Sequence, residues 1–153
     1  MERRYGKSQL EFERYAFAAV ASLYGIDILA DNVSQCRERL FAVFDAVYER
    51  LFPQTSKAGC RDAIRFVLAH NIVWGDALTL KTVGEKPDLI VFSEWSPVNG
   101  CMVKRRDYTF HGLLEHASMK ELPLFSDLGE EVFIPTPVKE FPLIHFLEVS
   151  NAE

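Results

Sequence analysis

Residues 32–53 read NVSQCRERLFAVFDAVYERLFP, and no other stretch of the chain has so strong a helical periodicity. Apolar side chains recur every three or four residues in two adjacent rows, which together make one broad helix face. The rows comprise Cys36, Leu40, Val43, Val47 and Leu51, and Phe41, Phe44, Tyr48 and Phe52. Asn32 opens a capping-box pattern, and Pro53 ends the periodicity. The sequence therefore predicts a long amphipathic helix over residues 32–51.

Two further helices are predicted on either side of this one. Ser8 opens a second capping-box pattern, which predicts a helix over residues 8–24. Gly25 is expected to end that helix in a left-handed conformation. A third helix is expected over residues 57–70, and Asn71 is expected to end it in the same way. The first half of the chain is thus predicted to be helical.

The second half has the patterns of strands. Asn99 and Gly100 favour a hairpin turn because both tolerate positive φ angles. The centre of the strand after this turn is strongly polar, so we expect it at a sheet edge or on a solvated face. The predicted elements are strands at 76–83, 89–92, 101–110, 130–134 and 143–149 and a short helix at 111–121. The expected fold is one α+β domain over residues 1–153, with an N-terminal three-helix half packed against a C-terminal, mainly antiparallel sheet.

Composition favours an ordinary globular protein of the cytoplasm. A chain of 153 residues can bury a core without disulfides or a metal. Its cysteines, Cys36, Cys60 and Cys101, form no CxxC pair, so neither a zinc site nor a redox dithiol is predicted. The N-terminal residues are polar, and the longest apolar run is far too short to span a membrane. We predict no cofactor, no metal and no membrane partner.

Enzymatic motifs are missing from the sequence. It contains no phosphate-binding glycine loop, no nucleophile elbow and no metalloprotease motif. An enzyme would have to draw its groups from Cys101, His111, Glu115 and Asp76. His111 and Glu115 share a helix face at best, and Asp76 is better explained as a turn cap. The sequence therefore favours a role other than catalysis.

Charge is distributed unevenly along the chain. The net charge is −1 over residues 1–52, +2 over residues 53–110 and −6 over residues 111–153. Carboxylates interleaved with phenylalanines suit docking on a basic protein surface. The residues predicted to bind a partner are Glu121, Asp127, Glu130, Glu131, Glu140, Phe133 and Phe141. The leading hypothesis is a small protein-binding module, an inhibitor, immunity protein or antitoxin comparable in size and character to anti-CRISPR proteins, that docks on a nucleic-acid-handling partner.

A nucleic-acid-binding role is the main alternative. The order of two helices and a hairpin resembles that of a winged-helix domain, with helix 57–70 in the major groove and strand 101–110 on phosphate. The basic residues concerned are Arg61, Arg65, Lys104, Arg105 and Arg106. The acidic net charge and the alternating faces of the last three weigh against this alternative.

Overall fold

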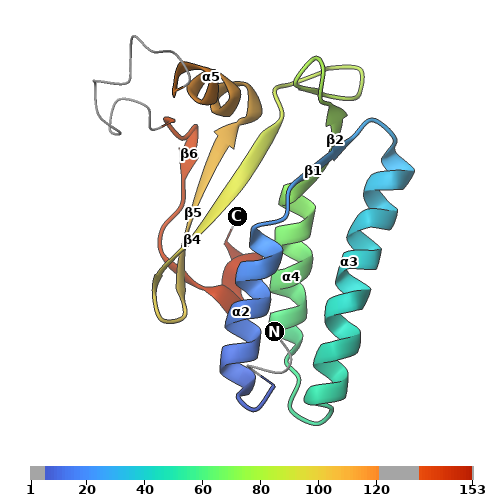
Figure 1. Cartoon of the computed structure of the whole chain (residues 1–153), viewed down its shortest axis with the longest axis vertical. Coiled ribbons are helices and arrows are strands. Elements are labelled where there is room, and N and C mark those ends of the chain that lie inside the picture. Colours follow the sequence, from blue (N-terminus) through green and yellow to red (C-terminus); the bar gives the residue numbers. More distant parts are fainter. Residues whose placement is uncertain (1–5, 121–134, 153) are drawn as a thin grey trace.

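The fold is α+β, and its N-terminal half is a group of three helices. The computed structural model describes residues 6–120 and 135–152. The helices are α2 (Gln9–Ala21), α3 (Ala30–Leu51) and α4 (Ala58–Asn71). Figure 1 shows the three helices side by side. A long hairpin packs against α2 and α4, and α3 lies on the side away from the hairpin. The predicted fold class is confirmed.

The strands form two sheets. The small mixed sheet contains β1 (Gly25–Asp27), β2 (Ile72–Asp76) and β3 (Lys81–Thr82), with β1 parallel to β2. The antiparallel sheet contains β4 (Val91–Asn99), β5 (Met102–Thr109), β6 (Lys139–Glu140) and β7 (Ile144–His145). α5 (Phe110–Lys120) follows β5, and the short 3₁₀ helix η3 (Phe146–Asn151) follows β7. Residues 143–149, predicted as one strand, are therefore mostly 3₁₀ helix, and the predicted strand 130–134 lies outside the described residues.

Short polar side chains lie near the starts of the first two helices. The Ser8 hydroxyl accepts a hydrogen bond from the Glu11 amide at 3.4 Å, as predicted for the cap of α2. The predicted Asn32 cap of α3 is wrong, because the N-cap residue is Leu29, which makes no side-chain cap hydrogen bond, and Asn32 lies inside the helix. Just before the helix, the Asp27 carboxylate accepts from the Leu29 amide at 2.8 Å and from the Asn32 side chain at 3.0 Å. These hydrogen bonds lower the pKa of Asp27, and α3 begins at Ala30.

Both predicted left-handed helix ends are wrong. α2 ends at Ala21, and Gly25 instead begins β1. Asn71 is the last residue of α4 and is fully buried. Its side-chain amide donates to the Ala21 carbonyl at 3.1 Å and accepts from the Trp95 indole at 3.2 Å. Asn71 thus ties α4 to the end of α2 and to β4.

The hairpin of β4 and β5 is confirmed, but its place in the sheet differs from the prediction. Gly100 adopts a φ of 54° in the turn. β5 pairs with β4 on one side and with β6 and β7 on the other, so it is not an edge strand. β4 is an edge of this sheet among the described strands, which allows it to continue through Pro97 although proline cannot donate to a ladder.

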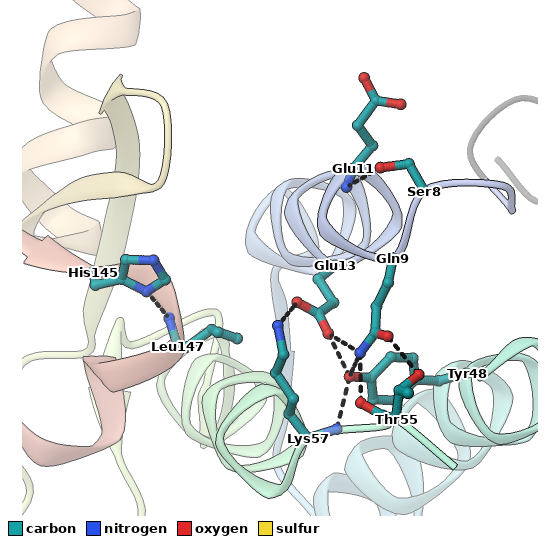
Figure 2. Close-up of polar contacts among 9 residues, drawn as sticks. All are labelled: Ser8, Gln9, Glu11, Glu13, Tyr48, Thr55, Lys57, His145 and Leu147. Carbon is teal, nitrogen blue, oxygen red and sulfur yellow. Dashed lines mark hydrogen bonds and ion pairs between the residues drawn. The ribbon is translucent and has the colours of Figure 1, made fainter. Parts of the chain in front are cut away.

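The core lies between the hairpin and the helices. Trp95 of β4 and Val103 of β5 are buried there against α2 and η3. The Trp95 and Phe17 rings meet edge to face, with centroids 6.2 Å apart. His145 accepts from the Leu147 amide at 3.2 Å and so caps η3 (Figure 2). Among the residues that the structure describes, no helix combines the length and the apolar character needed to cross a membrane.

Candidate functional site

A buried carboxylate at one end of the helical group organises the most extensive polar cluster (Figure 2). Glu13 of α2 is 0% exposed. Its Oε1 accepts from the Tyr48 hydroxyl at 2.5 Å and from the Gln9 side chain at 2.8 Å, and its Oε2 pairs with Lys57 Nζ at 3.0 Å. A buried charge is tolerated only when it is paired and hydrogen-bonded in this way. The cluster joins α2, α3 and the start of α4.

Tyr48 is the centre of this cluster. Its oxygen donates to Glu13 and accepts from the backbone amide of Lys57 at 2.9 Å. Burial and the hydrogen bond to Glu13 raise the pKa of Tyr48 well above its usual range. Because Tyr48 and Glu13 are fully enclosed, we assign the cluster a structural role and no chemistry on a ligand.

Cys60, which lies beside this cluster, should make the protein sensitive to alkali. Burial, assisted by the negative charge of Glu13, raises the pKa of this thiol from 9.0 to about 12. Between these values the folded chain keeps a proton that the unfolded chain releases, so stability falls as pH rises, by up to about 1.4 kcal/mol per pH unit. Denaturant titrations at pH 9 and 10 should show a shallower fall for Cys60→Ala than for the wild type.

The exposed thiol of Cys36 provides the control for this experiment. Cys36→Ala should retain the wild-type dependence of stability on pH, because it removes an exposed thiol and leaves the buried thiol of Cys60 in place. If Cys60→Ala declined as steeply as the wild type, the buried thiol would not be the source of the effect.

A pocket of about 470 Å³ with aromatic walls lies where β4, β5 and α5 meet. Phe92 of β4 is nearly perpendicular to Tyr24 (84°, centroids 5.4 Å apart) and to Phe110 (80°, 5.5 Å). Tyr108 completes the aromatic lining, and Glu94 places a carboxylate there. The pocket falls in the size range of small-ligand sites.

The phenols of this pocket are held in place. Tyr24 donates its hydroxyl proton to the Ser93 carbonyl at 3.0 Å, and Tyr108 donates to Glu94 Oε2 at 3.3 Å. Burial, followed by the charge of Glu94, raises the pKa of both tyrosines. Glu94 and both phenols line the same pocket. None of these residues was a predicted site residue, because the lining joins β4 and β5 to Tyr24, about 70 positions earlier in the chain.

A second hollow lies between α2 and α3 and has a volume of about 300 Å³. Its lining is entirely apolar and includes Leu23, which is 42% exposed, and Val43, which is 70% exposed. α2 is therefore not enclosed on all sides, although its sequence is apolar or small nearly all round from Tyr15 to Leu23. Without a polar group, this groove offers shape but no charge selectivity.

Two of the predicted partner-binding residues lie in the described part of the chain. Glu140 of β6 pairs with Arg106 at 3.3 Å and with Lys104 at 3.8 Å. Phe141 is only 8% exposed, with the guanidinium of Arg105 lying 4.0 Å from its ring centroid. Phe141 is thus largely buried within the chain, whereas the Glu140 side chain is 53% exposed and ion-paired. The other predicted residues lie outside the described part: Glu121, Asp127, Glu130, Glu131 and Phe133.

The basic residues of the nucleic-acid hypothesis are engaged within the chain. Arg61 pairs with Asp45 at 2.5 Å and with Glu49 at 2.6 Å, and Arg65 lies 3.8 Å above the Phe41 ring. On the hairpin, Lys104 and Arg106 face Glu140 and Arg105 is buried. A nucleic-acid interface stays a prediction. Phosphate groups would have to bind basic side chains that already contact carboxylates or aromatic rings of this chain.

Arg105 and Asp107 form a buried ion pair between the hairpin and the helices. The guanidinium contacts both carboxylate oxygens at 2.9 Å, and the Ser93 hydroxyl donates to Asp107 at 2.7 Å. Aromatic rings surround the guanidinium, including Trp95 at 5.4 Å. The prediction that the polar centre of β5 lies at an edge or in solvent is therefore wrong for this face of the strand.

The candidate enzyme residues do not form one site. Cys101 lies in the turn before β5 and lines an apolar pocket of about 130 Å³, whereas His111 follows the far end of that strand. Eight strand residues separate them, which corresponds to roughly 25 Å at a rise of ~3.3 Å per residue. His111 contacts Glu115 at 3.2 Å on the exposed side of α5. Asp76 accepts from the Leu78 amide at 2.8 Å and caps a turn, as expected.

Metal binding also lacks a ligand set in the described part of the chain. No group of three or more His, Cys, Asp or Glu side chains there could hold a metal ion. Comparison of the chain with known protein families, with curated proteins and with solved structures finds no match.

Proposed function

We propose that the chain is a small acidic protein-binding module, of the inhibitor, immunity-protein or antitoxin class, that docks on a basic, nucleic-acid-handling partner. The charge distribution carries this proposal. In the described residues, Asp and Glu outnumber Lys and Arg by one, whereas residues 121–134 contain four acidic side chains and no basic one. The surplus negative charge is therefore concentrated in one short stretch of the sequence.

The ion pairs of the described residues support the same proposal. Arg61, Arg105 and Arg106 each lie within 4 Å of a carboxylate of this chain, so their fields are largely compensated. Positive and negative charges nearly balance over the described residues. The acidic stretch at residues 121–134 is therefore the main source of long-range attraction. Such a stretch attracts basic surfaces most strongly at low salt.

A pair of charge-matched variants tests the proposal in affinity capture from the source cell. One variant neutralises the acidic stretch: Glu121→Gln, Asp127→Asn, Glu130→Gln and Glu131→Gln. The other neutralises the same number of exposed carboxylates elsewhere: Asp31→Asn, Glu38→Gln, Glu85→Gln and Glu148→Gln. The wild type and the second variant should retain the same basic protein, with retention falling as salt increases, and the first variant should lose it.

The two variants carry equal net charge, so a difference between them reports the position of the charge. Equal retention by both variants would contradict the proposal. A retained partner that is itself acidic, or one whose retention ignores salt, would contradict it as well.

A further inference from the structure

We propose that the aromatic pocket between β4, β5 and α5 binds an organic cation of the trimethylammonium type. Four aromatic residues line the pocket, and one carboxylate, that of Glu94, stands among them. Aromatic faces attract cations through their quadrupoles, and sites of this composition suit quaternary ammonium groups. The described residues that line the pocket are not those that carry the proposed function, so different variants test the two proposals.

The arrangement of the rings supports a compact ligand. Tyr24 and Phe110 both stand nearly perpendicular to Phe92, so the lining surfaces face in different directions. A spherical group such as trimethylammonium can contact several such surfaces at once, whereas a flat ligand would stack on one. The hydroxyls of Tyr24 and Tyr108 are already hydrogen-bonded, so the rings need little reordering on binding.

Glu94 selects the sign of the ligand charge. Its side chain is 48% exposed, and its nearest cation, Arg106, lies 3.7 Å away and is shared with Glu140. The carboxylate is therefore only partly compensated and can attract a second cation. An anion would meet both this carboxylate and the electron-rich ring faces, and a neutral ligand would gain nothing from Glu94.

Choline and its neutral carbon isostere, 3,3-dimethylbutanol, provide the direct test. The full chain is titrated with each compound, and backbone amide NMR signals of Ser93, Glu94 and Phe110 are followed. Choline should shift these signals and bind about tenfold or more tightly than the isostere, because only choline carries the charge that the rings and Glu94 attract. Equal affinity of the two compounds, or no shift with choline, would overturn the proposal.

Matched variants show whether the pocket residues are responsible. Glu94→Gln should weaken choline binding about fivefold or more, whereas Glu38→Gln removes an exposed carboxylate of α3 that is not among the pocket residues and should leave binding unchanged. Tyr108→Phe keeps the ring and should bind choline, while Tyr108→Leu should not. The NMR spectra also report whether each variant is folded. Wild-type binding by a folded Glu94→Gln variant would contradict the proposal.

The source of the cation is distinguished by a second titration. A peptide with one trimethylated lysine is compared with the unmodified peptide and with choline. Preference for the methylated peptide assigns the pocket to a modified protein, and preference for choline assigns it to a small molecule. Either result supports trimethylammonium recognition, and tighter binding of the unmodified peptide than of both other ligands would overturn it.

Discussion

Replacing Arg105 by methionine is expected to lower the free energy of unfolding by about 3–5 kcal/mol. Arg105 and Asp107 are each 8% exposed, and the arginine supplies both hydrogen bonds that neutralise the carboxylate. Among the described residues, Arg105→Met leaves the buried Asp107 carboxylate with only the Ser93 hydroxyl as a donor. Urea denaturation followed by circular dichroism measures the loss.

A double variant separates the cost of an unpaired charge from the cost of lost packing. Arg105→Met with Asp107→Leu removes both charges and fills the space with apolar groups, so it should recover most of the stability lost in the single variant. The coupling between the two positions would then be several times larger than for an exposed pair. A double variant no more stable than Arg105→Met would show that the ion pair is not the reason for the loss.

Tyr48→Phe is expected to destabilise the protein by about 2–4 kcal/mol. The change removes one hydroxyl that donates to the buried Glu13 carboxylate and accepts from the Lys57 amide. Water does not reach the Glu13 carboxylate that loses its donor, since Tyr48 and Glu13 are 0% exposed. The midpoint of urea denaturation is the measurement.

Tyr24→Phe is the matched control for Tyr48→Phe. It also removes one phenolic hydroxyl, but Tyr24 is 48% exposed and its hydroxyl makes a single hydrogen bond to the Ser93 carbonyl. Water can replace that bond, so the loss should be about 1 kcal/mol or less. If Tyr48→Phe and Tyr24→Phe lowered the free energy of unfolding equally, the Tyr48 hydroxyl in the Glu13 cluster would contribute no more to stability than an ordinary surface hydrogen bond.

The three helices could be predicted because their signals are local. Apolar spacing located α2, α3 and α4, and the hydroxyl of Ser8 marked the start of α2. The errors concern interactions that reach across the chain. Asn32 lies inside α3 and donates to Asp27 of β1, and Asn71 is held in its helix by contacts with Ala21 and Trp95. The spacing of apolar residues along the sequence does not predict these contacts.

The strands were harder to predict, for two physical reasons. β2 follows α4 directly, so no turn residue separates the two elements at Ile72. β4 continues through Pro97 because its outer edge has no strand partner among the described residues. The polarity of β5 suggested an edge, but Arg105 and Asp107 satisfy each other in the interior. Polarity alone cannot distinguish a solvated strand from one that carries a buried pair.

The candidate functional residues could be predicted only in part. The acidic surplus after α5 is a property of the sequence itself. The aromatic pocket depends on Tyr24 lying against Phe92, and only the fold brings these two residues together. The buried cluster had one visible sign, which is that Glu13 is a lone acid between the apolar positions of α2 that pack inward.

The alternation of charge along β5 also affects how the hairpin folds. Arg105 and Asp107 face the helices, whereas Arg106 faces outward toward Glu94 and Glu140. Sliding β5 by one residue would turn Arg106 inward without a carboxylate and leave the Arg105–Asp107 pair in water. Such a misaligned hairpin would bury an uncompensated cation, which is strongly unfavourable. The buried pair therefore discriminates against wrong strand alignments while the chain is folding.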